Sequence, residues 1–147
     1  MDDSSRKAVV NRSVPQATVI PVLAYEDVGQ AVEWLCEVFG FRLRLRIGDH
    51  RAQLLFGDGA MIVNKRQEGE SPRSIVMRHS LLVQVDDVDS HYAHALERGA
   101  RILDAPTDYF YGERQYNVED LGGHQWTFSQ SIADVDPESW GATVYNG

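Results

Sequence analysis

The sequence predicts an α+β domain in which two β-α-β-β-β modules form a mixed sheet. Three observations lead to this prediction. An apolar stripe with helical spacing runs from Val28 to Phe39, strict alternation of apolar and polar residues follows it in 41–47, and the same order of patterns recurs about 60 residues later. We therefore expect an internal pseudo-dyad within a single domain.

The chain of 147 residues has the length of one domain, and its 43% of hydrophobic residues are enough for a core without disulfides. The first residues are polar and follow no helical or strand period, so we expect a flexible N-terminal arm at 1–16. The domain is expected at 17–130, with modules at 17–64 and 76–130, and a C-terminal tail at 131–147.

The first module begins with a β-branched run at 18–23, whose Pro21 indicates an edge strand or a strand start. Asp27 is placed to cap a helix, with Gln30 as the second half of a capping box, and Gly40 ends the helix in a left-handed conformation. Three strands then follow at 41–47, 51–56 and 60–64, separated by turns at 48–50 and 57–59.

The alternation in 41–47 predicts an apolar face and a cationic face, the latter formed by Arg42, Arg44 and Arg46. These arginines could hold an anion, or they could form a solvated or dimer-facing surface. A polar linker is expected at 65–74.

The second module repeats the pattern. A strand at 79–85 leads to Asp86-Asp87-Val88, which opens a helix that Gly99 terminates. The remaining predicted strands lie at 100–103, 114–119 and 124–129, with turns at 104–106 and 121–123.

Composition excludes several classes of protein. The net charge of −8, from 14 basic and 22 acidic residues, disfavours nucleic acid as a partner. Uncharged stretches are too short for a membrane span and no secretory signal is visible, so we expect a cytoplasmic protein that does not interact with membranes. The single cysteine, Cys36, excludes an internal disulfide and a zinc ribbon, and its place on the helical stripe favours a buried thiol.

The duplicated unit, with Glu26-Asp27-Val28 and Asp86-Asp87-Val88 at the helix starts, resembles the vicinal oxygen chelate superfamily of glyoxalases, bleomycin-resistance proteins and dioxygenases. Residues 111–114 and 119–126 look like the signature of its glyoxalase-like branch. The resemblance implies that each module curls its sheet into half a cup with the helix on the convex side. It also implies a ligand in the concavity and a homodimer whose cups are completed across chains.

Metal-dependent members of this superfamily carry ligands on the first and last strands of each module. Of the matching positions, His79 is a suitable ligand, whereas Ile20 and Thr127 are not and Asn64 offers only a neutral oxygen. We therefore expect no cofactor and disfavour a divalent metal, with His79 as a weak candidate ligand.

The resemblance places the ligand-binding residues on the second module. If Thr127 points into the cup, Gln125 lies on the same face, while Trp126 and Phe128 face the helix. The remaining candidates are His79 and three residues before or on the seventh strand: Tyr109, Tyr111 and Arg114. Tyr109 and Tyr111 could stack on a flat ligand or pack in the core, and Arg114 could bind a ligand oxygen or pair with Glu113 and Glu119.

We expect a small-molecule-binding protein that works without a metal, of which sequestration of a bleomycin-like antibiotic is one form. The opposing hypothesis is a metal-dependent glyoxalase-like lyase or isomerase, or a dioxygenase, and a third is an interaction module. The acidic second half favours a cationic ligand and the arginines of 41–47 an anionic one, and the sequence leaves this choice open.

Overall fold

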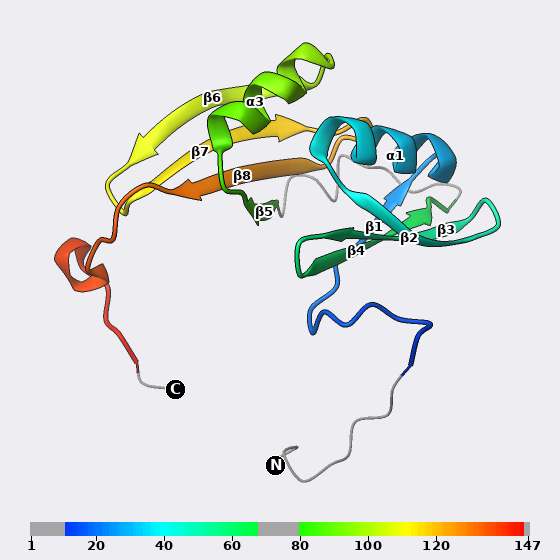
Figure 1. The fold of residues 1–147 in the computed structure, drawn as a ribbon, viewed down its shortest axis with the longest axis horizontal. Coiled ribbons are helices and arrows are strands. Elements are labelled where there is room, and N and C mark those ends of the chain that lie inside the picture. The colour runs from blue at the N-terminus through cyan, green and yellow to red at the C-terminus, as the bar shows by residue number, and fades with distance from the viewer. Residues whose placement is uncertain (1–10, 68–79, 146–147) are drawn as a thin grey trace, which may run out of the picture.

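The structure is a computed structural model that describes residues 11–67 and 80–145 (Figure 1). The first module contains β1 (Val22–Tyr25), α1 (Val28–Trp34), the π-helical turn η2 (Leu35–Phe39), β2 (Arg42–Ile47), β3 (Arg51–Phe56) and β4 (Gly59–Lys65). The second contains β5 (Leu81–Gln84), α3 (Val88–Glu97), β6 (Arg101–Tyr109), β7 (Glu113–Glu119) and β8 (Gln125–Ser131), and the tail carries the 3-10 helix η3 (Pro137–Trp140). No helix in these described ranges is long and apolar enough to cross a membrane.

The two modules have the same topology, which confirms the predicted duplication and the α+β fold class. Sheet A has the strand order β1-β4-β3-β2 and sheet B the order β5-β8-β7-β6. In each sheet the first strand pairs in parallel with the last, and the other pairs are antiparallel. Sheet B arches beneath α3, and α1 lies over sheet A (Figure 1). We call the opposite, helix-free side of each sheet its open face.

The first helix has the predicted extent, but its last turn is wider than an α-helix. Asp27 accepts a hydrogen bond from the Gln30 amide, as expected of an N-cap, and Gly40 ends the helix with φ of 91°. In the π-turn, the amide of Phe41 reaches back to the Leu35 carbonyl. Two histidines of α3 satisfy carbonyls of this turn: His91 Nε2 donates to Phe39 O at 2.8 Å and His94 Nε2 donates to Glu37 O at 2.8 Å.

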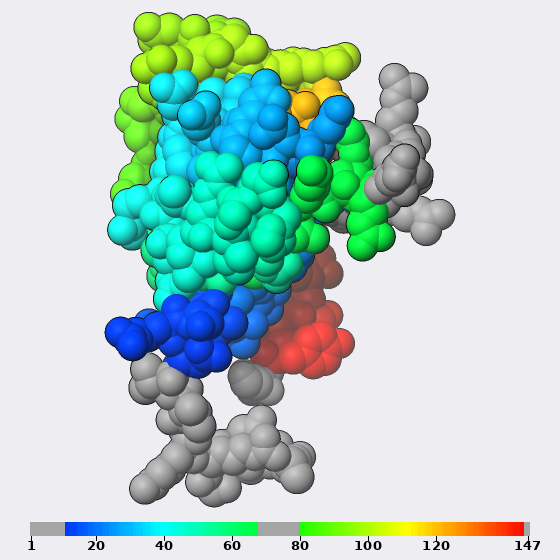
Figure 2. Space-filling view, turned by 90° about the vertical axis from the view of Figure 1, so that its right-hand side faces the viewer, coloured from blue at the N-terminus to red at the C-terminus, as the bar shows by residue number. Residues whose placement is uncertain are grey.

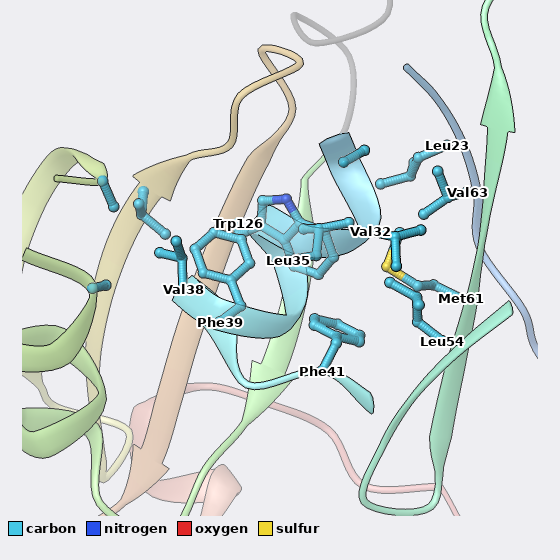
Figure 3. Packing of buried hydrophobic residues seen from close by; sticks show 14 of the residues in the cluster. Leu23, Val32, Leu35, Val38, Phe39, Phe41, Leu54, Met61, Val63 and Trp126 are labelled. Carbon is cyan, nitrogen blue, oxygen red and sulfur yellow. The ribbon is translucent and has the colours of Figure 1, made fainter. Parts of the chain in front are cut away.

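One hydrophobic core joins the modules (Figure 3). Phe39 of η2 is nearly fully buried, and its ring lies 5.3 Å from that of Trp126 and 4.9 Å from that of Phe128, both on β8. On the sheet A side, Leu54 and Met61 belong to the same cluster. The helical segment of the first module thus packs on a strand of the second, and the two modules share one core.

Two strand boundaries differ from the prediction. The first strand begins at Val22 and not at 18, since Pro21 lacks the amide that strand pairing needs and contributes only its carbonyl, which accepts from the Ile62 amide. The turn predicted at 104–106 is wrong, because β6 runs on to Tyr109 with irregular pairing near Asp104. An edge strand such as β6 tolerates a proline and a bulge, which in the sequence look like a turn.

The predicted division of β2 into an apolar and a cationic face is also wrong. A bulge between Leu43 and Leu45 shifts the register, so that Leu43 lies opposite the buried Leu54 while Leu45 lies opposite Gln53 on the open face. Arg46 consequently lies beside Gly29 of α1. The arginines of this strand therefore do not form a single row.

Candidate ligand-binding site

The open face of sheet B is polar. Trp126 and Phe128 are buried in the core beneath the helices, whereas Thr127 and Ser129 point to the other face, which confirms the alternation predicted for this strand. On the adjacent β7, Gln115 lies opposite Ser129 and Asn117 lies opposite Thr127. The two central strands thus present a row of hydroxyl and carboxamide groups.

Hydrogen bonds hold these side chains in two small networks. Thr127 Oγ1 donates to Asn117 Oδ1 at 2.5 Å, and Asn117 Nδ2 donates to Asp104 Oδ2 at 2.8 Å. A side chain held by such a bond loses little rotamer freedom when a ligand arrives, so less of the binding free energy is lost to ordering.

The second hydrogen-bond network centres on Ser129, which is fully buried. Its hydroxyl donates to Glu113 Oε1 and accepts from Gln115 Nε2 at 3.2 Å. Gln115 Oε1 accepts in turn from the Tyr111 hydroxyl at 3.4 Å. The polar floor therefore extends directly to an aromatic side chain.

Tyr109 and Tyr111 form a stacked pair at the end of sheet B, with ring centroids 5.4 Å apart and planes inclined by 8°. Tyr109 lies opposite Glu113, so it belongs to the open face. Desolvation, together with Tyr109 and the Glu113 carboxylate, raises the pKa of Tyr111, so its hydroxyl remains protonated near neutral pH. Trp140 of the tail lies 6.2 Å from Tyr111 and completes a small aromatic wall.

An apolar cleft of about 330 Å³ adjoins the polar floor between the two modules. Its lining includes Phe41, Phe56, Leu82 and Trp126. Leu82 pairs with Thr127 in the parallel β5–β8 ladder, so the cleft and the polar row share an edge. A volume of this size is at the lower end of the range of small-molecule sites.

Three of the four residues at the superfamily's metal positions do not fit a divalent ion. Ile20 has no donor atom, Thr127 Oγ1 is engaged with Asn117, and Asn64 Oδ1 accepts from Arg51 Nη1 at 3.2 Å. The fourth position, His79, lies outside the described residues, as does most of the predicted linker. Within 11–67 and 80–145, no three His, Cys, Asp or Glu side chains converge.

The structure stacks two of the predicted ligand-binding residues, Tyr109 and Tyr111, and places Thr127 on the same open face; Tyr109 pairs with Glu113, whereas Thr127 pairs with Asn117, four residues along β7. Gln125 lies at the exposed end of β8, opposite Glu119, farther along the same strand. Arg114 is separated from these residues, because its guanidinium pairs with Asp108 at 2.6 Å and with Asp89 of α3 at 2.8 Å on the helix side of the sheet. These partners also differ from the Glu113 and Glu119 expected from the sequence.

Sequence reasoning missed four residues of the open face: Asp104, Glu113, Gln115 and Asn117. The signal was present in 113–119, where polar residues alternate with Tyr116 and Val118 in a strand period. The pattern at 104–106 predicts a turn, and a turn at Asp104 gives its side chain no place on a sheet face.

Comparison with known proteins identifies the family. Residues 17–128 match the Glyoxalase/Bleomycin resistance protein/Dioxygenase superfamily, and the chain belongs to it. Among curated proteins, an uncharacterized protein of Mycobacterium tuberculosis (strain ATCC 25618 / H37Rv) is 36% identical over 52 residues, which are 35% of this chain and 31% of that protein. The chain thus matches about a third of the length of that curated relative.

Solved structures give longer matches. TioX from Micromonospora sp. ML1 is 37% identical with a TM-score of 0.65, and the match covers 82% of this chain and 100% of that chain. TnmS3, an antibiotic binding protein from Streptomyces sp. CB03234, is 22% identical with a TM-score of 0.59, over 79% of this chain and 98% of that one. The fosfomycin resistance protein FosX from Listeria monocytogenes is 11% identical with a TM-score of 0.64, over 79% and 93%. The last two similarities show the fold alone.

Proposed function

We propose that this protein binds a small organic molecule of the antibiotic type on the open face of sheet B, and that it does so without a metal. The observation that carries the proposal is the pre-ordered row of Thr127, Asn117 and Gln115, which is held from below by the buried Ser129 and lies between an aromatic wall and an apolar cleft. Polar groups of this kind orient a ligand, and the cleft and the tyrosines supply the apolar contact area.

The electrostatics of this face favour a neutral or cationic ligand. Glu113 and Asp104 contribute carboxylates to the polar row, whereas Arg114 faces away and is paired with two aspartates. An anionic ligand would therefore meet like charges at short range. Sequestration needs only a shaped and partly desolvated surface. Such a surface does not depend on metal ligands, so substitutions at the metal positions do not remove it.

We also propose that the protein acts as a cytoplasmic homodimer. Gln115, Asn117 and Thr127 on the open face of sheet B are half-buried in the single chain, and a second copy would enclose a ligand there more fully. The similarity to TnmS3, an antibiotic binding protein with the same fold, supports the binding of a small molecule and does not bear on the dimer. Sedimentation of the purified protein tests the dimer directly.

A matched pair of variants on β7 and β8 tests the assignment of the open face. Thr127→Val keeps the shape of the side chain and removes the hydroxyl, and Arg114→Gln changes a charged group on the helix side. With bleomycin and aromatic cations as probes, followed by tryptophan fluorescence, Thr127→Val should weaken binding about fivefold to tenfold, as the loss of one hydrogen bond predicts. Arg114→Gln should leave the Kd within about twofold. The reverse pattern would contradict the proposal, as would binding that disappears after chelation of metal ions.

A further inference from the structure

We propose that the open face of sheet A is a subsite for a peptidic ligand, and that residues 11–16 of the chain occupy it in place of that ligand. This inference goes beyond the proposed function, which concerns sheet B, and the two can fail independently. Figure 1 shows the arm running along the side of sheet A opposite α1, and Figure 2 shows it beneath the first module. The expected flexible arm therefore has a defined path from residue 11 onward.

Two side chains of the sheet bind the main chain of the arm. Arg44 Nη2 donates to the carbonyl of Arg12 at 2.9 Å, and Gln53 Nε2 donates to the carbonyl of Ser13 at 2.8 Å. Arg44 Nη1 also donates to Gln53 Oε1 at 2.7 Å, which holds the carboxamide with its N–H group towards the arm. The pair thus presents two donors to the carbonyls of consecutive residues.

The bulge in β2 makes this arrangement possible. It places Leu45 opposite Gln53 and leaves Arg44 as the extra residue, whose side chain reaches across to the Gln53 carboxamide. Gln53 is only 3% exposed, and Ile62 beside it is 7% exposed. Because the occupant itself covers Gln53, a molecule that lies there must bring an acceptor for the carboxamide, as the arm does with the Ser13 carbonyl.

The chemistry of the occupant can be inferred from how the arm is held. The bonds from Arg44 and Gln53 reach main-chain carbonyls, while the side chains of Arg12 and Ser13 are exposed. Pro15, two residues further on, is buried. The subsite therefore recognises two successive amide carbonyls followed by a compact apolar ring, and it does so largely independently of the side chains between them.

The surface beside the arm leaves room for a ligand larger than the arm. A hollow of about 580 Å³ is bordered by Asn11, Arg12 and Ser13 on one side and by Leu45 and Ile47 on the other. Ile47 is 45% exposed although it points to this face. A peptidic molecule that displaced the arm would gain both hydrogen bonds and cover this apolar surface.

Trans binding of the arm sequence to the full-length chain tests the inference. Pro15→Asp places a carboxylate where the ring is buried and should release the arm. The probe is a fluorescein-labelled, C-terminally amidated peptide with the sequence of residues 11–16, Asn-Arg-Ser-Val-Pro-Gln, followed by anisotropy. It should bind the Pro15→Asp protein at least about tenfold more tightly than the wild type, whose own arm competes.

A second substitution tests whether the peptide binds at this subsite. Gln53→Glu is isosteric and keeps an oxygen for Arg44, but it loses the N–H group that binds the carbonyl. In the Pro15→Asp background it should weaken peptide binding about tenfold, whereas Gln30→Glu on the exposed surface of α1 should have no effect. Thr127→Val should also leave the peptide affinity unchanged, which separates this subsite from the proposed site on sheet B.

The state of the arm can be measured in the same variants. Trypsin cleavage after Arg12, whose carbonyl is bound to Arg44, should be several-fold faster in Pro15→Asp than in the wild type, while far-UV circular dichroism should be unchanged. Equal peptide affinity of the wild type and Pro15→Asp, or insensitivity to Gln53→Glu, would overturn the inference.

Discussion

Asp120 is the polar residue on which we expect the stability of the fold to depend most strongly. It is 5% exposed and accepts four hydrogen bonds. Oδ2 accepts from the Tyr25 hydroxyl at 2.6 Å and from Trp126 Nε1 at 2.9 Å, and Oδ1 accepts from the amides of Gly122 at 2.9 Å and His124 at 3.0 Å. Since Tyr25 belongs to β1 and Trp126 to β8, this carboxylate joins the two modules.

The substitution Asp120→Asn preserves the shape of the side chain but turns Oδ2 into a donor. The Trp126 N–H group would then face another N–H group, and a buried donor without a partner costs about 1–3 kcal/mol. The remaining hydrogen bonds to this side chain would no longer have a charged acceptor. This loss is worth about 1 kcal/mol in total, after subtraction of the gain from no longer burying a carboxylate charge. We expect a loss of about 3 kcal/mol in the free energy of unfolding, which corresponds to a fall in Tm of roughly 6–12 °C.

Urea unfolding followed by tryptophan fluorescence and circular dichroism measures this loss. Tyr25→Phe should cost about 1–2 kcal/mol alone, and the double variant should lose less than the sum, because Asp120→Asn already weakens the hydrogen bond that Tyr25→Phe removes. Asp49→Asn, in an exposed turn, is the matched control and should change stability by less than about 0.5 kcal/mol. A loss below about 1 kcal/mol for Asp120→Asn, or strict additivity with Tyr25→Phe, would refute the reasoning.

Three further predictions follow from the buried groups and from the tail. Burial lowers the pKa of His91 below its ordinary value of about 6.5. On acidification the unfolded chain therefore takes up a proton while the native imidazole stays neutral. The stability that is present above this pH is lost as the pH falls, by at most about 1.4 kcal/mol per pH unit. Urea titrations at pH 7.5 and 5.5 should show a smaller fall for His91→Gln than for the wild type, and equal falls would contradict the assignment. Gly112 has φ of 88°, and a Cβ atom there would meet the Ala133 carbonyl oxygen. Gly112→Ala should therefore cost about 2–4 kcal/mol of stability and make Trp140 more accessible to acrylamide. An unaltered quenching constant would show that the tail is not held at this glycine. Desolvation raises the pKa of the Cys36 thiol, so iodoacetamide should alkylate it at least about tenfold more slowly in the native protein than in urea, and equal rates would show that the thiol is not shielded.

The sequence was sufficient to predict the architecture because both modules carry strong local signals. Asp27 and Asp87 cap their helices as expected, each accepting a hydrogen bond from the amide three residues later. The alternation through Trp126 and Phe128 correctly predicted which face of β8 is buried. These features depend on neighbouring residues in the chain, which is why periodicity reveals them.

The features that escaped prediction depend on contacts between distant segments. The bulge at Arg44 occurs where this side chain bonds to Gln53 and to the arm, and no period in 41–47 indicates it. Arg114 lies on the helix side because it alternates with Glu113 and Gln115 along β7, but its ion pair with Asp89 of α3 spans 25 residues and no period indicates it. Sequence reasoning could thus predict the faces of regular strands, but not the partners of long side chains.

The central claim is that the open face of sheet B holds a small organic molecule without a metal and without chemical change. The most direct measurement is titration calorimetry of bleomycin and aromatic cations into protein purified with and without a chelator, with mass spectrometry of the recovered ligand. We predict a Kd below about 100 μM for at least one of these ligands, the same value after chelation, and an unaltered ligand mass. No heat at high micromolar concentration, or binding that requires a metal and yields a product, would contradict the claim.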